Sequence, residues 1–268
     1  MLDFGEMPSQ GFRPVAEELA NRFPATIELT TYAMILAVIL GIPSGILSAT
    51  RKDKLPDHVT RAVALTGVSI PIFWLGILLL WLFYGTLRLE AFAPVGRLSF
   101  TNQTWYDGHK ITGIVTLDSF VQLNWDVFFD GLAHLILPSI ALAYTSMALI
   151  TRMMRSSMLE VMGQDYIKAA RAKGLSEKVV IKKHAKRNAM IPTTTVIGLS
   201  YGGLLGGAVL TETVFTYPGM GQWSVRMLVD LDFTGVMALT FITAIVYVLA
   251  NLVVDIVYAY LDPRIKLE

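Results

Sequence analysis

The chain has 268 residues, of which 54% are hydrophobic and only 16% are charged, with a net charge of +1 and no cysteine. The absence of cysteine excludes disulfides, thiolate metal sites and a cysteine nucleophile. The small net charge gives no electrostatic support to nucleic-acid binding, so no nucleic-acid partner is expected.

Apolar residues are clustered in five runs of about 20 or more residues, each long enough to cross a hydrocarbon core of about 30 Å as a helix. A lipid-exposed backbone must satisfy its hydrogen bonds within its own segment, so each run is predicted to be helical. The predicted fold class is therefore all-α, a polytopic membrane helix bundle. The runs are residues 25–48, 62–87, 131–151, 188–211 and 233–261.

Four prolines lie inside these runs or near their ends, and we expect neighbouring helices to tolerate them as kinks. They are Pro43, Pro71, Pro138 and Pro192.

Basic residues between the runs predict the orientation of the chain. Residues 51–61, 152–187 and 264–266 hold 16 of the 22 lysines and arginines. The side that is richer in basic residues is the cytoplasmic one. The C-terminus is thus predicted to be cytoplasmic, and residues 1–24, 88–130 and 212–232 external.

The N-terminal segment, residues 1–24, has no basic start followed by an apolar run, so it does not have the pattern of a signal peptide. An external N-terminus without a signal needs something upstream to carry it across the membrane. We therefore expect that a first helix is missing from this chain.

The external loop 88–130 is polar and aromatic. Its rings at Trp105, Tyr106 and Trp125 are predicted to anchor at the membrane interface. The alternative is a docking surface for an external partner.

The cytoplasmic loop 152–187 contains a short alanine-rich segment that predicts a helix, a stop and a second helix. Ala169 and Ala170 favour the helix, and Gly174 can end it in the left-handed conformation. Ser176 can cap the helix that follows. A small helix of this kind suits a groove on another protein; the alternative is a loop that is basic only because it is cytoplasmic.

The order of several motifs resembles the oligopeptide and dipeptide branch of binding-protein-dependent ABC transporter permeases. Residues 169–174 are similar to the A-A-x-x-x-G core of the EAA loop of that family, although Lys168 stands where the general motif has glutamate, and residues 184–187 replace its usual ending. Further similar segments extend the resemblance over essentially the whole chain. They are residues 3–5, 22–26, 155–160, 187–192, 206–208, 212–215, 218–221, 251–255 and 261–264.

The resemblance implies a permease subunit of an importer in a prokaryotic plasma membrane. Relatives have six spans with both ends inside, so five spans with an external N-terminus match that plan without its first helix. Implied partners are a second permease subunit in a heterodimer, one or two cytoplasmic ATPases, an external solute-binding protein and the lipid bilayer. Residues 25–268 would form the permease domain.

The EAA loop of this family docks on the ATPase, which implies a coupling role for six residues. This chain lacks the G-x-x-x-x-G-K-[ST] phosphate loop. We therefore expect that it is not an enzyme and binds no cofactor, and that ATP and Mg are bound by the partner subunits. The expected coupling residues are Ala169, Ala170, Arg171, Lys173, Gly174 and Leu175.

The substrate implied by the resemblance is a dipeptide or oligopeptide, with oligosaccharides or nickel as alternatives found in relatives. An ion-coupled secondary transporter is a different class, but it would show inverted repeats and midplane acids or histidines, and neither is evident. The four histidines lack metal-ligand spacing, so no metal site is expected.

Three further groups of residues are candidates for roles within the membrane domain. Small-residue spacing at Gly202, Gly203, Gly206 and Gly207 predicts helix packing or a lining of the translocation path. The turn containing Glu212, Pro218, Gly219 and Gly221 would lie at the outer mouth by family position, as an outer gate. Asp255 is an intramembrane acid, for which we expect a structural role or, alternatively, substrate contact.

Overall fold

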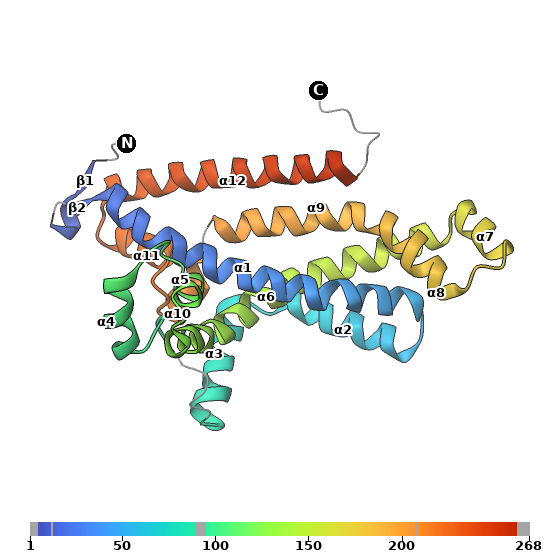
Figure 1. Cartoon of the computed structure of the whole chain (residues 1–268), viewed down its shortest axis with the longest axis horizontal. Helices are drawn as coiled ribbons and strands as arrows, with labels where there is room; N and C mark the ends of the chain where they lie inside the picture. The colour runs from blue at the N-terminus through green and yellow to red at the C-terminus, as the bar shows by residue number, and fades with distance from the viewer. Residues whose placement is uncertain (1–4, 12, 89–94, 207, 262–268) are drawn as a thin grey trace. The chain divides into compact units, whose positions relative to one another are not determined.

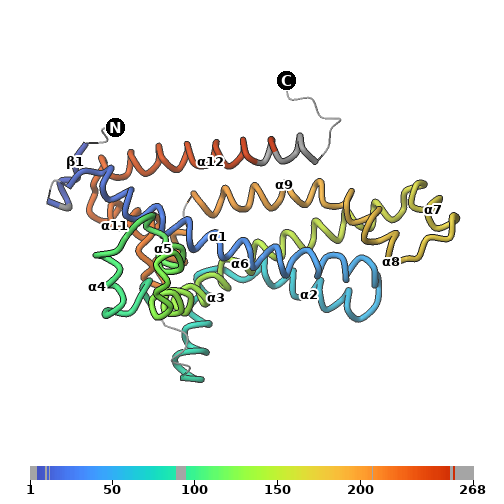
Figure 2. The backbone as a smooth tube through the Cα atoms, viewed as in Figure 1, coloured from blue at the N-terminus to red at the C-terminus, as the bar shows by residue number. Residues whose placement is uncertain are grey.

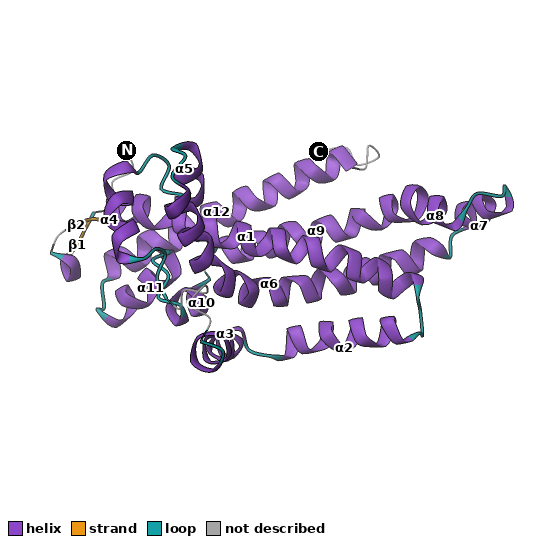
Figure 3. Cartoon of the chain, turned by 60° about the horizontal axis from the view of Figure 1, so that its bottom comes forward, coloured by secondary structure: helices purple, strands orange, loops and turns teal. Residues whose placement is uncertain are grey.

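The computed structural model describes residues 5–11, 13–88, 95–206 and 208–261, without the side chains of residues 10, 254, 255 and 257–261. In this part of the chain the elements are helices, apart from the short antiparallel strands β1 (Glu6–Met7) and β2 (Arg13–Pro14), in which Met7 pairs with Arg13 (Figure 3). The 3-10 turn η1 (Pro8–Gln10) connects the two strands. The predicted all-α fold class is confirmed.

Three helices are long and apolar enough to cross a membrane, namely α1 (Val15–Thr50), α6 (Trp125–Met162) and α12 (Phe233–Leu261) (Figure 1). The helix α9 (Lys186–Leu205) covers most of the fourth predicted span but is less apolar. Pro43, Pro138 and Pro192 lie inside α1, α6 and α9, which continue through them as predicted. The number of five spans stays a prediction.

The second predicted span is interrupted at Pro71, so the expectation of a kinked but continuous helix over residues 62–87 was wrong. It consists of α2 (Leu55–Ser69), then α3 (Ile72–Leu80), which continues into the π-helical turn η2 (Trp81–Thr86). Proline has no N–H and disfavours helical geometry at the preceding residue. Ile70 accordingly is extended, with φ −82° and ψ 125°.

Two helices begin well before the predicted spans, and the external loop 88–130 contains helices of its own. The helix α1 begins at Val15 and α6 at Trp125, while α4 (Phe100–His109) and α5 (Val115–Val121) lie within the loop. Hydropathy marks only the part of a helix that lipid surrounds. The 38 residues of α6 exceed the length that a hydrocarbon core of about 30 Å requires.

The chain forms two compact units, and several long helices contribute to both. Unit 1 consists of Met1–Ala33, Pro71–Leu142 and Gly203–Val248, and unit 2 of Met34–Ile70, Ala143–Gly202 and Leu249–Glu268. Unit 1 contains α10 (Val209–Val214) and α11 (Met220–Val229), and its core includes the fully buried side chains of Phe215, Tyr217 and Trp223.

Unit 2 contains the cytoplasmic loop of the sequence prediction. After α6 come α7 (Asp165–Ala172), α8 (Glu177–Val179) and the π-helical turn η3 (Val180–Ala185), which leads into α9. The chain reverses between α7 and α8, so that the two lie side by side (Figure 2). The predicted order of short helix, stop and second helix is found here.

Candidate functional site

The helix α7 is attached to unit 2 by one face and exposes the other. Ile167 and Ala170 are buried against Met154 and Met158 of α6. Ala169, on the other face, is exposed. An apolar contact of this size fixes the position of a short helix that could not persist alone.

Four other predicted coupling residues also lie at the surface of unit 2. Arg171, Lys173, Gly174 and Leu175 are exposed, whereas Ala170 faces inward. Ala170 therefore packs α7 against unit 2, and the other five of the six predicted residues are exposed and accessible to a partner.

The turn after α7 is fixed by backbone geometry and by an ion pair. Gly174 has φ +78°, and the N–H of Leu175 donates to the carbonyl of Ala170 at 3.4 Å. This is the helix ending that favours glycine. Arg171 donates Nε and Nη2 to the two carboxylate oxygens of Glu177 at 3.0 and 2.7 Å, and this contact lowers the pKa of Glu177 below its usual value.

Ser176 does not make the side-chain cap that its position predicts. It precedes α8, but its hydroxyl makes no capping hydrogen bond. Its carbonyl instead accepts the N–H groups of Val179 and Val180 at 2.9 and 3.1 Å. The segment α8 has only three residues before the wider turn η3. Its first turn is defined by these backbone hydrogen bonds.

A buried acid in the first turn of α2 is bound to α6 within unit 2. Asp57 accepts from Arg155 Nε and Nη2 at 2.8 Å each, and from Ser48 Oγ at 2.5 Å. A paired carboxylate of this kind is costly to leave without its partner. Arg155 begins one of the segments that carry the family resemblance, whereas Asp57 was not singled out from the sequence.

The predicted outer-gate residues form one compact turn in unit 1. Glu212 is fully buried and its carboxylate accepts from Thr26 Oγ1 at 2.8 Å and from the N–H of Gln222 at 3.0 Å. Its burial raises the pKa of Glu212 above the usual value despite these hydrogen bonds. The carboxylate thus closes the beginning of α11, where free N–H groups favour an anion.

Two glycines of this turn are required by close contacts, and Pro218 stands at its bend. A Cβ on Gly219 would lie 2.4 Å from the Glu212 carboxylate, and one on Gly221 would lie 2.6 Å from Val209 Cα. The N–H of Gly219 donates to the carbonyl of Tyr217 at 2.8 Å across Pro218. This three-residue turn has Pro218 at its centre, and the ring of Pro218 restricts φ there.

We predict that Gly219→Ala destabilises unit 1 by about 1–3 kcal/mol, because the new methyl group overpacks the Glu212 carboxylate. The free energy of unfolding of the purified protein in detergent measures the change. Gly108→Ala is the matched control, because a Cβ there meets nothing within 4 Å and alanine favours the α4 helix. Equal stability of the two variants would contradict the steric argument.

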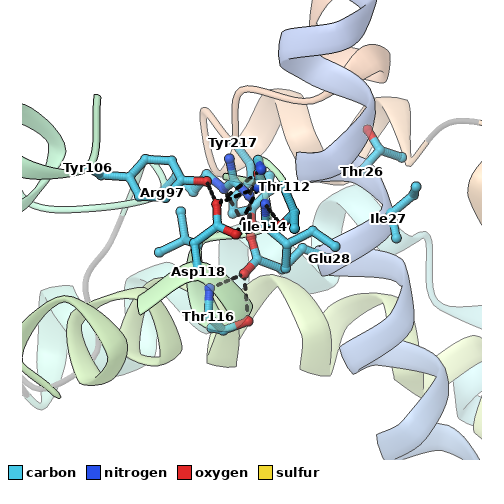
Figure 4. A network of polar contacts seen from close by, with 12 residues as sticks. Thr26, Ile27, Glu28, Arg97, Tyr106, Thr112, Ile114, Thr116, Asp118 and Tyr217 are labelled. Carbon is cyan, nitrogen blue, oxygen red and sulfur yellow. Dashed lines mark hydrogen bonds and ion pairs between the residues drawn. The ribbon is translucent and has the colours of Figure 1, made fainter. Parts of the chain in front are cut away.

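A second buried network in unit 1 joins α1 to the external loop (Figure 4). Glu28 of α1 pairs with Arg97, and its other oxygen accepts the N–H and hydroxyl of Thr116 at 2.7 Å each. Tyr217 OH also donates to Glu28 at 3.2 Å. The side chains of Glu28 and Arg97 are 0% and 8% exposed, so this pair is removed from water.

Asp118 organises the external loop from inside. It accepts the N–H groups of Ile111, Thr112 and Gly113 at 2.9–3.2 Å and the hydroxyl of Tyr106 at 2.9 Å. Burial alone would raise the pKa of Asp118, but these hydrogen bonds lower it below its usual value. Tyr106 is therefore a buried partner of Asp118, and the prediction that it anchors in the membrane interface was wrong.

The remaining predicted residues are only partly within the described chain. A Cβ on Gly203 would meet nothing within 4 Å, Gly202 is buried, and Gly206 is half-buried after the end of α9. Gly207 lies outside the described residues. Asp255 falls on α12, but its side chain is also outside the described part.

Comparison with known proteins gives consistent matches over most of the chain. Residues 41–267 match the family described as binding-protein-dependent transport system inner membrane component. The probable D,D-dipeptide transport system permease protein DdpB of Escherichia coli (strain K12) is 47% identical, over 94% of this chain and 73% of its own length.

Two further relatives and one solved structure agree with this match. The dipeptide transport system permease protein DppB of the same strain is 45% identical, over 94% of this chain and 74% of its own length. The oligopeptide transport system permease protein AppB of Bacillus subtilis (strain 168) is 38% identical, over 98% of this chain and 76% of its own length. A chain of the inward-facing MetNI methionine ABC transporter superposes with a TM-score of 0.66 at 14% identity, covering 92% of this chain and 97% of that one, which shows a shared fold.

Proposed function

The chain belongs to the family of binding-protein-dependent transport system inner membrane components, and from this premise we propose that it is the membrane-spanning permease subunit of an ATP-driven importer of short peptides. The peptide substrate is supported by similarity to relatives named as D,D-dipeptide, dipeptide and oligopeptide permeases, at 38–47% identity. The long apolar helices α1, α6 and α12 supply the membrane-crossing part.

The observation that carries the mechanism is α7, a small helix fixed to unit 2 by Ile167 and Ala170 with its other face open. We infer that this open face docks on a cytoplasmic ATPase. Ala169, Gly174 and Leu175 would make the close contact because they are small or apolar, with Arg171 and Lys173 as polar contacts beside them. Because α7 is packed on α6, a displacement imposed by the ATPase would pass into the helices of unit 2.

The same proposal assigns the other partners and the orientation. ATP and Mg would be bound by one or two ATPase subunits, and this chain would have no catalytic role. A second permease subunit would complete the translocation path, and an external binding protein would deliver the peptide. In a prokaryotic plasma membrane, residues 152–187 and the C-terminus would face the cytoplasm, with residues 1–24 and 88–130 outside.

The glycines and the outer turn receive roles within this arrangement. The open space at Gly203 supports a contact with the partner permease or the translocation path more than close packing inside this chain. The turn at Glu212, Pro218, Gly219 and Gly221 is tightly braced, which supports a rigid outer element of the gate. Asp255 is assigned a structural role on α12, as its sequence position suggests.

Oligosaccharide or nickel import remains the second candidate for the substrate, because selection in this family rests largely with the external binding protein. Ion-coupled transport is the candidate from a different class. One uptake experiment separates these possibilities.

The experiment reconstitutes this chain with its partner permease, ATPases and binding protein in liposomes and follows uptake of labelled dialanine. We expect uptake that requires internal ATP, stops when vanadate blocks ATP hydrolysis and continues when a protonophore collapses the proton gradient. Uptake that the protonophore stops while ATP is present would overturn the ATP-driven mechanism. ATP-dependent uptake of nickel or an oligosaccharide without uptake of dialanine would overturn the peptide assignment alone.

A further inference from the structure

Two short helices of unit 1 end in the same unusual junction, each just before a long helix. After α5, Leu123 has φ +56°, and the N–H of Asn124 donates to the carbonyl of Ser119 at 2.9 Å. Asn124 Oδ1 then accepts the N–H of Val127 at 3.2 Å and so caps α6.

The junction after α11 repeats this pattern. Leu231 has φ +53°, and the N–H of Asp232 donates to the carbonyl of Met227 at 2.9 Å. Asp232 Oδ1 accepts the N–H of Gly235 at 3.1 Å and caps α12. Each junction thus consists of a left-handed leucine, a capping Asn or Asp, and an aromatic residue that begins the long helix, Trp125 or Phe233.

Leucine is a costly residue at these two positions. The left-handed conformation costs an L-residue about 1–2 kcal/mol, and glycine or asparagine is usual there. This chain itself has Gly174 in the equivalent position after α7. Contacts inside the protein do not explain the choice, because Leu123 is 68% exposed and Leu231 is 73% exposed.

Several apolar residues near each leucine are also exposed, with the charged residues Asp126 and Asp230 exposed among them. On α5 the polar residues Thr116, Asp118 and Ser119 are buried together with Val115, whereas the other apolar side chains are exposed. Leu228 and Val229 are exposed in the same way at the end of α11. The exposed apolar residues at the α5 junction are Leu117, Phe120, Val121, Leu123 and Trp125.

Both apolar patches continue onto helices that are long and apolar enough to cross the membrane. Phe233, Met237 and Phe241 are exposed at four-residue intervals along α12, and Trp125 and Phe129 are exposed in the same way on α6. Residues four apart share one face of a helix. The leucines are therefore at the beginning of the surfaces that lipid would cover.

We propose that the junctions at residues 120–125 and 228–233 are inserted into the bilayer, with Leu123 and Leu231 in contact with lipid acyl chains just below the headgroups. The contact with lipid offsets the backbone cost of a leucine in the left-handed conformation. Trp125 fits this level of the membrane, where aromatic rings are enriched. This proposal does not depend on which substrate is transported or on what drives transport.

The test uses the absence of cysteine from this chain, which allows single labels without background from the chain itself. Leu123→Cys and Leu231→Cys, each carrying a nitroxide, are placed in the assembled transporter in phosphatidylcholine liposomes. Collision rates are measured with oxygen, which concentrates in lipid, and with a water-soluble nickel chelate. Thr101→Cys on α4 is the control, because it is exposed on the same unit but lies in a polar helix.

We expect the ratio of oxygen to nickel-chelate collisions at both leucine positions to exceed the ratio at Thr101 several-fold. A ratio equal to that of Thr101 would place the junctions in water and overturn the proposal. Low collision rates with both oxygen and the nickel chelate would show that another protein subunit covers these positions. That result would also overturn the proposal. Val121→Cys and Val229→Cys give the same test at exposed positions outside the left-handed conformation, should the first variants fail to fold.

Discussion

Replacing Ala169 by tryptophan is expected to abolish ATP-dependent uptake while the protein stays folded in the membrane. The side chain of Ala169 is exposed on α7, so a larger residue disturbs no internal packing. An indole on this face would hold the proposed ATPase surface away from the helix. A loss of about 1.4 kcal/mol in docking lowers the affinity for the ATPase about tenfold, and an indole that keeps the two surfaces apart costs more, so we expect uptake to fall at least about tenfold.

The measurement compares uptake of labelled dialanine with the amount of ATPase that copurifies with the permease. Ala20→Trp is the matched control, because Ala20 is an exposed alanine on α1 in the other unit. We expect Ala20→Trp to retain both activity and copurification. Normal uptake by the Ala169 variant would contradict the proposed coupling face, whatever the substrate is.

Replacing Arg97 by methionine is expected to cost about 3–5 kcal/mol in the free energy of unfolding. The substitution leaves the Glu28 carboxylate buried without its countercharge, and it removes the hydrogen bond from Arg97 Nη2 to the carbonyl of Gly113. Unfolding of the purified protein in detergent gives the value. The external loop should lose protection from proteolysis at the same time, because Glu28 also holds Thr116.

Two further variants separate the ion pair from the loss of arginine as such. Arg13→Met removes an exposed arginine that contacts Glu18 at 3.4 Å, and we expect a change of about 0–1 kcal/mol. Glu28→Met combined with Arg97→Met removes both buried charges and should recover part of the loss. An effect of Arg97→Met no larger than that of Arg13→Met would show that the buried pair contributes little.

The features that were predictable from the sequence are those set by nearby residues. Alanines followed by Gly174 define a short helix with a left-handed ending, and the structure has both. The apolar runs locate the long helices, although hydropathy does not show how far α1 and α6 extend beyond lipid. The complete interruption at Pro71 depends on how the chain around Ile70 packs, which one proline does not specify.

Pairings between distant residues were not predictable in this way. Glu28 and Arg97 are 69 positions apart, and Asp57 and Arg155 are 98 positions apart. One signal was available, because Glu28 is an acid within an otherwise apolar predicted span, which by itself indicates a partner. The position of Tyr106 was wrongly predicted because its burial depends on the contact with Asp118. That contact forms only when the loop folds around the Asp118 carboxylate.

The attachment of the external loop to Glu28 limits how this protein can be recombined with its relatives. The segment from Arg97 to Asp118 carries its own polar interior, so it can be exchanged as a block only if position 28 of the recipient still offers a carboxylate to the incoming arginine and threonine. A donor loop placed on a recipient without that acid would bring a guanidinium into a dry interior with nothing to neutralise it. Chimeras should therefore be designed with the α1 segment and the loop taken from the same parent.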